Sequence, residues 1–317
     1  MCVLTCSYLR WISTPVAYAR SMLDRVLVTL DGKVHDAERP FLYADDLAAL
    51  RGDGVFETVL VRAGRACAIE LHLGRLKFSA EAIELPGPDL GVWRSAVERA
   101  AAEWGAEQEG MMRLVLSRGR ESGGPQTGYV LVGPVTDRVV AARRDGISAM
   151  TLTRGHSIEL GQSAPWQLLG AKTLSYATNM AAQRFAERCG ADDVIFISSE
   201  GRVLEGPTAT VVMVKGKRMV TPPPKFGILS GTTQRALFEV AGMSGYDCAY
   251  APLFPADLIT ADGLWLVSSV RLAARVHTLD GLTLPVVADG AEFAALVDRA
   301  VVEVGRSRNE VPPESVA

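Results

Sequence analysis

Short strand-like runs separated by turn residues recur through both halves of this 317-residue chain, and this pattern most constrains its fold. Val26–Leu30 leads into Asp31-Gly32, a dipeptide typical of a tight hairpin turn. In the second half, Ser199–Gly201 and Lys215–Lys217 join similar runs. Helical segments interrupt the runs without the regular strand–helix order of a doubly wound sheet. We therefore predict an α+β fold.

The spacing of apolar residues predicts two helices in the first half. Leu73, Leu76 and Ala80 recur at intervals of three and four, which places them on one face of a helix over about Glu70–Glu84. A second helix is predicted over about Leu90–Trp104.

The length of the chain suggests two domains of roughly 150 residues each. The polar and charged stretch Ala142–Gly146 is the candidate boundary. We predict an N-terminal domain over 22–142 and a C-terminal domain over 147–310. Residues 1–21 precede the first convincing strand, and we expect them to form a disordered extension.

Composition argues against several classes of function. The formal net charge is −3 and no block of Lys or Arg occurs, so we expect neither a nucleic-acid partner nor a membrane surface. The opening residues lack the basic and apolar regions of a signal peptide, and no run approaches the ~20 apolar residues of a membrane span. The five cysteines and four histidines are dispersed, which favours a reducing compartment and argues against a metal site. We expect a cytoplasmic protein.

One lysine is set apart from the other five. Lys172 lies in the small and apolar run Leu168–Leu174, whereas the others lie in turns or on polar faces. A lysine that attacks a carbonyl must be desolvated, because burial lowers its pKa and frees the amine. Lys172 is therefore a candidate nucleophile. From these residues alone, the alternative is a solvated lysine at the start of a helix.

Two further segments have the chemistry of a cofactor site. Leu229–Thr233 precedes a predicted helix and offers backbone N–H groups and hydroxyls to a phosphate, although an ordinary N-cap is the alternative. Arg75 is a candidate donor to the same phosphate, or a solvated helical arginine. Glu205 follows a strand beside a turn. A carboxylate there can keep a pyridine nitrogen protonated, and a surface glutamate is the alternative.

The order of these features resembles the class IV aminotransferases over about Arg25 to Thr278. That family comprises branched-chain aminotransferases, D-amino-acid transaminases and 4-amino-4-deoxychorismate lyases. The resemblance implies a homodimeric fold-type IV enzyme that uses pyridoxal 5′-phosphate, with a smaller α/β N-terminal domain and a larger, barrel-like C-terminal domain. The matching motifs are Gly52–Glu57, His72–Leu76, Lys172, Glu205-Gly206, Thr221-Pro222 and Leu229–Thr233.

The resemblance also implies a role for each matching residue. Lys172 becomes the Schiff-base lysine and proton shuttle, and Glu205 the partner of the pyridine nitrogen. Arg118 looks like the arginine that binds a substrate carboxylate in the D-amino-acid branch, with a strand-end arginine in solvent as the alternative. The implied phosphate ligands are Arg75, Thr232, Thr233 and Ser269.

Two features favour the lyase among the reactions of this family. Phe56 stands where transaminases of the D-amino-acid branch, and many branched-chain ones, carry a tyrosine that faces the substrate. The run Lys172–Ala177, with Ala191–Asp193 downstream, resembles sequences assigned as aminodeoxychorismate lyase. We therefore predict release of 4-aminobenzoate and pyruvate from a small amino substrate, in folate biosynthesis. Arg118 suits an amino-acid carboxylate equally well, so D-amino-acid or branched-chain transamination, alone or as a second activity, stays the alternative.

Overall fold

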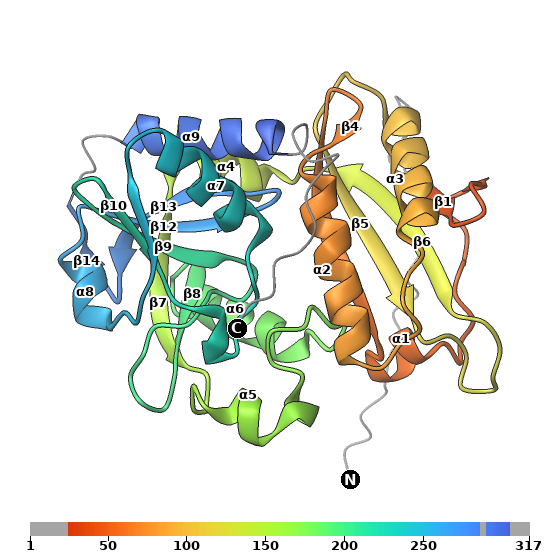
Figure 1. Ribbon diagram of the computed structural model, residues 1–317, viewed down its shortest axis with the longest axis horizontal. Helices are drawn as coiled ribbons and strands as arrows, with labels where there is room; N and C mark the ends of the chain where they lie inside the picture. The colour runs from red at the N-terminus through yellow and green to blue at the C-terminus, as the bar shows by residue number, and fades with distance from the viewer. Residues whose placement is uncertain (1–24, 286–289, 305–317) are drawn as a thin grey trace, which may run out of the picture.

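The computed structural model describes residues 25–285 and 290–304. The predicted extension over 1–21 lies outside the described residues, as do the first three residues of the predicted N-terminal domain and residues 286–289 and 305–310 of the predicted C-terminal domain. Figure 1 shows two lobes side by side, each built around one sheet. Within the described ranges, no helix is long and apolar enough to cross a membrane.

The first lobe is a six-stranded sheet in which every neighbouring pair is antiparallel, in the order β2-β1-β6-β5-β3-β4. The hairpin predicted at Asp31-Gly32 joins its first two strands. The strands are β1 (Val26–Thr29), β2 (Val34–His35), β3 (Gly54–Arg62), β4 (Arg65–Ala66), β5 (Gly110–Ser117) and β6 (Thr127–Pro134).

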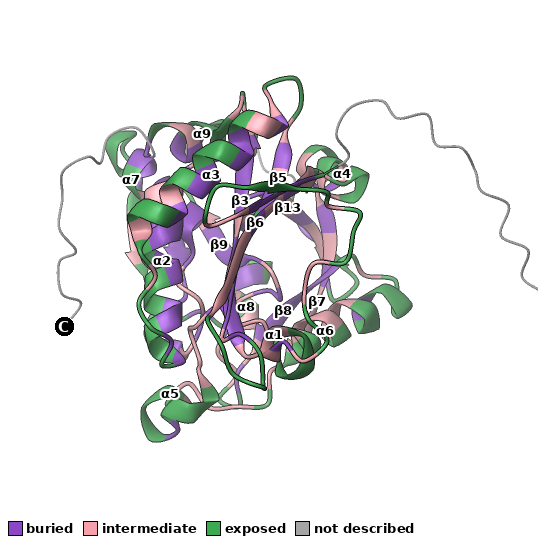
Figure 2. Ribbon diagram, turned by 90° about the vertical axis from the view of Figure 1, so that its right-hand side faces the viewer, coloured by how far each residue is buried: buried purple, intermediate pink, exposed green. Residues whose placement is uncertain are grey.

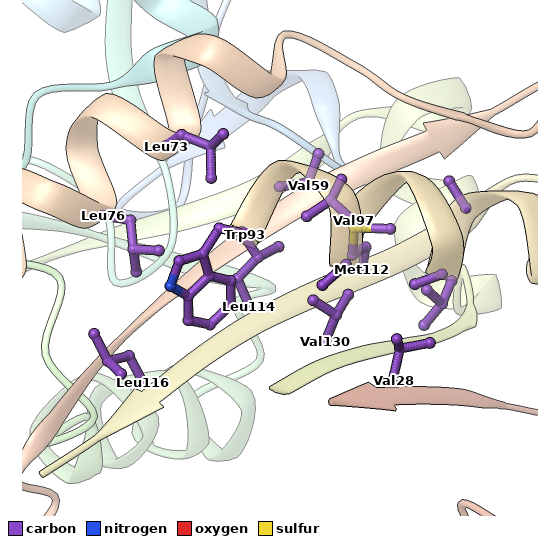
Figure 3. Close-up of a cluster of buried hydrophobic side chains, with 14 of the residues drawn as sticks. Val28, Val59, Leu73, Leu76, Trp93, Val97, Met112, Leu114, Leu116 and Val130 are labelled. Atoms are coloured by element: carbon purple, nitrogen blue, oxygen red, sulfur yellow. The ribbon is translucent and has the colours of Figure 1, made fainter. Parts of the chain in front are cut away.

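Both predicted helices are confirmed, as α2 (Ile69–Ala82) and α3 (Leu90–Trp104). They cover one face of the sheet, with their buried sides turned inward and exposed sides outward (Figure 2). Figure 3 shows Trp93 of α3 among apolar side chains of the sheet, including Leu114 of β5. The helix α2 lies on the side of the lobe that faces the second lobe (Figure 1).

The second lobe is an eight-stranded mixed sheet in the order β11-β10-β9-β12-β13-β7-β8, with β14 beside β13. Its central strands pair antiparallel, whereas β11 pairs in parallel with β10, β7 with β13, and β8 with β7. Five consecutive residues of β12 are buried, so both faces of this strand are covered. The strands are β7 (Ile147–Thr153), β8 (Asp193–Ile197), β9 (Thr210–Lys215), β10 (Arg218–Thr221), β11 (Asp247–Tyr250), β12 (Gly263–Ser268), β13 (Leu272–Leu279) and β14 (Leu282–Thr283).

Helices α7 and α9 pack against each other over this sheet, at the top of the second lobe in Figure 1. The helix predicted next to Leu229–Thr233 is confirmed as α7, which begins at Thr232. Besides α2 and α3, the α-helices of the described residues are α1 (Leu47–Arg51), α4 (Asp137–Asp145), α5 (Leu160–Ser163), α6 (Ala177–Arg188), α7 (Thr232–Met243), α8 (Pro255–Ile259) and α9 (Gly290–Glu303).

The structure adds local detail in two of the segments that the sequence singled out. Ala142–Gly146, the candidate boundary, contains the last turn of α4, which packs on β13. The chain therefore crosses between the sheets before α4, just after Pro134, and the predicted domain limits stay a prediction. The strand-like run after the Ser199–Gly201 turn, Arg202–Leu204, forms only a single bridge, from Val203 to Ile197.

Candidate active site

A cavity of about 530 Å³ lies between the two sheets. The first lobe contributes residues of β3 and β5, and the second contributes the loops around α6 and α7. The cavity walls include seven of the eight predicted site residues, which are Phe56, Arg75, Lys172, Glu205, Thr232, Thr233 and Ser269.

The backbone around Lys172 is held by the first lobe. The Lys172 carbonyl accepts a hydrogen bond from Phe56 N (3.0 Å), and Leu174 N donates to the Gly54 carbonyl (2.8 Å). Lys172 N in turn donates to Ser79 Oγ of α2 (3.0 Å). The segment therefore runs beside the start of β3, which fixes where its lysine side chain begins.

The Lys172 side chain is almost enclosed. The residue is 8% exposed, and its Nζ lies 4.3 Å from the centroid of the Phe56 ring and 5.3 Å from that of Tyr176. Burial, helped by the charge of Arg75, lowers the pKa of Lys172 to about 8. Burial also raises the pKa of Tyr176 to about 12, so its phenol stays neutral. Near neutral pH the amine therefore gains the character of a nucleophile.

Glu205 lies half-buried in another wall of the cavity. Leu229 N donates to its Oε2 (3.1 Å). Burial raises the pKa of Glu205 to about 7, against the hydrogen bond from Leu229 and the charge of Lys172. The carboxyl group therefore exchanges its proton near neutral pH, and a cationic partner in front of it would favour the ionised form.

Arg154, which the sequence did not single out, lies near this carboxylate. Its guanidinium stacks over the Phe196 ring at 4.6 Å, and Phe196 N is hydrogen-bonded to the Glu205 carbonyl (2.9 Å). Within the described ranges, Arg154 Nη1 is buried without a hydrogen-bond partner. The charge of Arg154 lowers the pKa of Glu205 and so favours the ionised carboxylate.

Three hydroxyls, which we call the hydroxyl cluster, meet at the start of α7. Ser269 Oγ lies 3.3 Å from Thr232 Oγ1 and 3.4 Å from Thr233 Oγ1. The first N–H groups of α7 have no partner inside the helix, and the helix dipole favours an anion there. A Cβ added at Gly231 would overlap Thr210 Oγ1, so the turn into α7 requires a glycine. The arrangement fits a phosphate.

A buried charge network lies beneath the hydroxyl cluster. Arg75 donates through Nε and Nη2 to the two oxygens of Glu57 (2.7 Å each) and through Nη1 to the Ser230 carbonyl (2.9 Å). His72 Nδ1 lies 2.7 Å from Glu57 Oε2. Burial alone would raise the pKa of Glu57, but the charge and hydrogen bonds of Arg75, together with His72, hold it well below its usual range.

Glu57 and His72 stand in the motifs quoted above, yet no role was predicted for either. The sequence nevertheless contains a pattern that predicts their contact. Side chains alternate along a strand, so Glu57 faces the helix-covered side when Phe56 faces the cavity. His72 and Arg75 are three residues apart on α2 and therefore share a face. An acidic strand residue opposite two basic helix residues indicates a buried ion pair.

Arg118 is the predicted site residue that the structure does not bring to the cavity. Its Nε donates to Asp53 Oδ2 (2.6 Å) and its Nη2 to the Ile83 carbonyl at the end of α2 (2.6 Å). A substrate role for Arg118 stays a prediction. Arg113 of β5 and Arg154 do line the cavity, and among the described residues neither has a carboxylate partner.

These groups together fit pyridoxal 5′-phosphate. The start of α7 with the hydroxyl cluster suits its phosphate, and the desolvated amine of Lys172 suits its aldehyde. The half-buried carboxylate of Glu205 suits a protonated pyridine nitrogen.

Comparison with known proteins agrees with this assignment. The family model for amino-transferase class IV matches residues 54–279. The chain is 56% identical over 286 residues to a curated protein of Mycobacterium tuberculosis, the bifunctional aminodeoxychorismate lyase / D-amino acid transaminase. The match covers 87% of this chain and 99% of that protein.

Solved structures give the same result. The PLP-bound form of a hypothetical aminotransferase from Mycobacterium tuberculosis superimposes with a TM-score of 0.86 at 56% identity, covering 88% of this chain and 99% of that one. A further structure of that aminotransferase contains α-ketoglutarate and PMP. A fold IV-transaminase from Curtobacterium pusillum gives a TM-score of 0.83 at 41% identity, over 88% and 98% of the two chains.

Proposed function

Because this chain belongs to the class IV aminotransferase family, whose members depend on pyridoxal 5′-phosphate, we propose that it is a 4-amino-4-deoxychorismate lyase. The observation that carries the proposal is the aromatic wall beside the reactive amine. Phe56 and Tyr176 meet edge to face with ring centroids 5.2 Å apart, next to Lys172 Nζ. This wall suits a cyclic substrate, and the relative at 56% identity bears the name of a lyase.

Each cavity residue has a distinct part in the proposal. When bound, the cofactor supplies an electron sink beside the reacting carbon. Lys172 holds the cofactor through Nζ, and Glu205 faces the ring nitrogen. The phosphate is bound by Arg75, Thr232, Thr233 and Ser269.

Lys172 also moves the proton that starts the reaction. Once the substrate amino group has displaced Lys172 from the cofactor, the free Nζ removes the proton from the ring carbon that bears that amino group. The bond between the ring and the enolpyruvyl oxygen then breaks. A returned proton completes pyruvate, and the ring becomes the aromatic 4-aminobenzoate. Aromatisation drives the cleavage, so the protein needs few further groups besides those that exclude water and hold the ring.

Transamination of D-amino acids or branched-chain amino acids is the second candidate. A specific observation supports it, since Arg113 and Arg154 line the cavity and, among the described residues, Arg154 Nη1 is buried without a hydrogen-bond partner. Either guanidinium suits the carboxylate of an amino acid or a keto acid. The relative at 56% identity is named for both activities. In this reaction Lys172 returns the proton to the cofactor rather than to a leaving group.

The deciding experiment supplies aminodeoxychorismate to the holoenzyme without any keto acid. We expect 4-aminobenzoate and pyruvate in equal amounts. Failure to release them, alongside rapid amino transfer from D-alanine to 2-oxoglutarate, would reverse the order of the two candidates. A Lys172→Ala variant is the control and should lack both activities.

We further infer a homodimer in the cytoplasm that serves folate biosynthesis and has no nucleic-acid or membrane partner. The family membership supports the dimer, and the dispersed thiols support a reducing compartment. Light scattering during gel filtration tests the oligomeric state, since a monomer at micromolar concentration would contradict the dimer.

A further inference from the structure

His72 joins a buried carboxylate to the hydroxyl cluster. Its Nδ1 faces Glu57, and its Nε2 lies 3.1 Å from Ser269 Oγ and 3.4 Å from Thr232 Oγ1. The ring is 2% exposed, so water does not compete for either nitrogen. The chemistry proposed above leaves this histidine without a part.

The partners of His72 determine which nitrogen carries hydrogen. Glu57 is ionised and can only accept, so Nδ1 holds a proton. Burial lowers the pKa of His72, so the ring is neutral without a ligand and Nε2 is an acceptor. The nearest hydroxyl, Ser269, therefore donates its single proton to Nε2.

This orientation weakens the hydroxyl cluster as an anion site. With its proton directed at His72, Ser269 cannot donate to a phosphate. When Nε2 gains a proton, the direction reverses, since Nε2–H donates to Ser269 Oγ and the Ser269 hydroxyl is free for the anion. One added proton thus supplies both a donor and a positive charge under the phosphate.

The charged groups around His72 act in opposite directions on its pKa. Glu57 on β3 favours the imidazolium form, whereas Arg75 on α2 and the nearby Lys172 oppose it. The groups that face the ring from the start of α7 and from the end of β12 are hydroxyls. A phosphate dianion placed on those hydroxyls would favour the imidazolium, as an opposite charge at close range does for any base.

We propose that His72 takes up a proton when the phosphate of the cofactor binds, and so makes cofactor binding depend on pH. The inference rests on the proposed phosphate site. His72 is a positioning residue, because it acts on the phosphate through Ser269 and Thr232.

The test uses pyridoxine 5′-phosphate, which lacks the aldehyde and leaves Lys172 unmodified, with the apoprotein in its native assembly. Calorimetry in two buffers of different ionisation enthalpy, near pH ~7.5 where a phosphate monoester is mostly a dianion, counts the protons taken up. His72→Gln cannot titrate, although its amide can still donate to Ser269. His35→Gln, at an exposed strand position, is the matched control.

We expect His72→Gln to take up close to one proton fewer than the wild type, and His35→Gln to match the wild type. The Kd of the wild type should rise by up to tenfold per pH unit relative to that of His72→Gln. Equal proton uptake by the wild type and His72→Gln overturns the inference. Failure of the wild type to bind the probe overturns the phosphate site as well.

A second measurement does not need a folded His72 variant. The wild type has four histidines, so side-chain ¹⁵N NMR can follow each ring, with His35→Gln, His156→Gln and His277→Gln used to assign the other three. The Nε2 signal of His72 should move from the unprotonated to the protonated range with pyridoxine 5′-phosphate, and stay unprotonated with pyridoxine. An unprotonated Nε2 in the phosphate complex contradicts the inference.

Discussion

Phe56 and Glu57 are neighbours on β3, yet their side chains serve opposite sides of the sheet. Phe56 lies against Lys172 Nζ in the cavity, whereas Glu57 is fully buried between Arg75 and His72. Because side chains alternate between the two faces of a β-strand, two consecutive residues of β3 contact both the reactive amine and the charge network beneath the proposed phosphate site. A shift of β3 by one residue would turn Phe56 away from the cavity and Glu57 toward it, and both sets of contacts would be lost.

The lowered pKa of Lys172 predicts how fast the cofactor attaches. Only the neutral amine attacks an aldehyde, so the rate should rise about tenfold per pH unit up to about pH 8 and then level off. An amine with the ordinary pKa of 10.5 would keep gaining rate above pH 8. Stopped-flow absorbance of the visible band, with borohydride bleaching to prove attachment, makes the measurement. Lys225→Ala is the control and should leave the profile unchanged.

Removal of the Glu57 charge should destabilise the fold. Glu57→Gln leaves Arg75 buried without a counter-charge, which costs roughly 3–5 kcal/mol. Glu70→Gln, in the partly exposed pair with Arg94, should cost at most about 1 kcal/mol. Urea unfolding measures both. A loss of less than about 1 kcal/mol for Glu57→Gln would contradict the buried ion pair.

The same carboxylate predicts how stability depends on pH. Because the folded pKa of Glu57 is lowered, its contribution is fully present above its ordinary value of 4.5 and is lost as the pH falls below it. The wild type should therefore lose its advantage over Glu57→Gln as the pH falls from about 6 toward about 3. A constant difference across that interval would show that the charge of Glu57 is not responsible.

Two glycines of the same segment should respond in opposite ways to alanine. Gly231→Ala places a methyl group against Thr210 and displaces the start of α7, so we expect cofactor affinity to fall at least about tenfold. Gly242 lies inside α7, and a Cβ there meets no atom within 4 Å. Gly242→Ala should therefore stabilise the protein by about 0.5–1 kcal/mol. Cofactor titration and thermal unfolding separate the two effects.

The charge of Arg154 should affect the pH at which the carboxylate of Glu205 ionises. In Arg154→Met the pKa of Glu205 should rise above about 7, because a favourable charge is lost. Half-maximal cofactor binding should then shift to higher pH, since the ring nitrogen pairs with an ionised carboxylate. Arg202→Met removes a similar stack, over Phe254, outside the cavity lining. An equal shift in both variants would contradict this role.

The sequence predicted those parts of the fold that carry a local pattern. Helices α2 and α3 have apolar residues at helical spacing. Helix α4 was missed because it is strongly polar, with Ala142 its one buried residue. Strand β13 was missed because Arg275 and His277 interrupt its apolar run, although pairing on both sides holds it in the sheet.

The residues of the site also fall into those that a local sequence pattern predicts and those that only the fold brings together. Lys172 and the glycine–threonine turn before α7 were predicted correctly as cavity residues, because the residues next to them in the sequence indicate their setting. Arg154 was not found, because its position over Phe196 arises from parallel pairing of β7 with β8, which are about forty residues apart. Burial and partners of such charged groups are properties of the folded chain, and the sequence near them carries no mark of either.

The cavity is lined by residues from both halves of the chain, and this bears on how the protein is made. Phe56 leaves the ribosome early, whereas Ser269 follows more than two hundred residues later, and both line one cavity. A nascent chain therefore has no complete site until synthesis is nearly finished. Capture of the cofactor thus marks a chain that has been translated through both lobes, and truncated products should remain colourless.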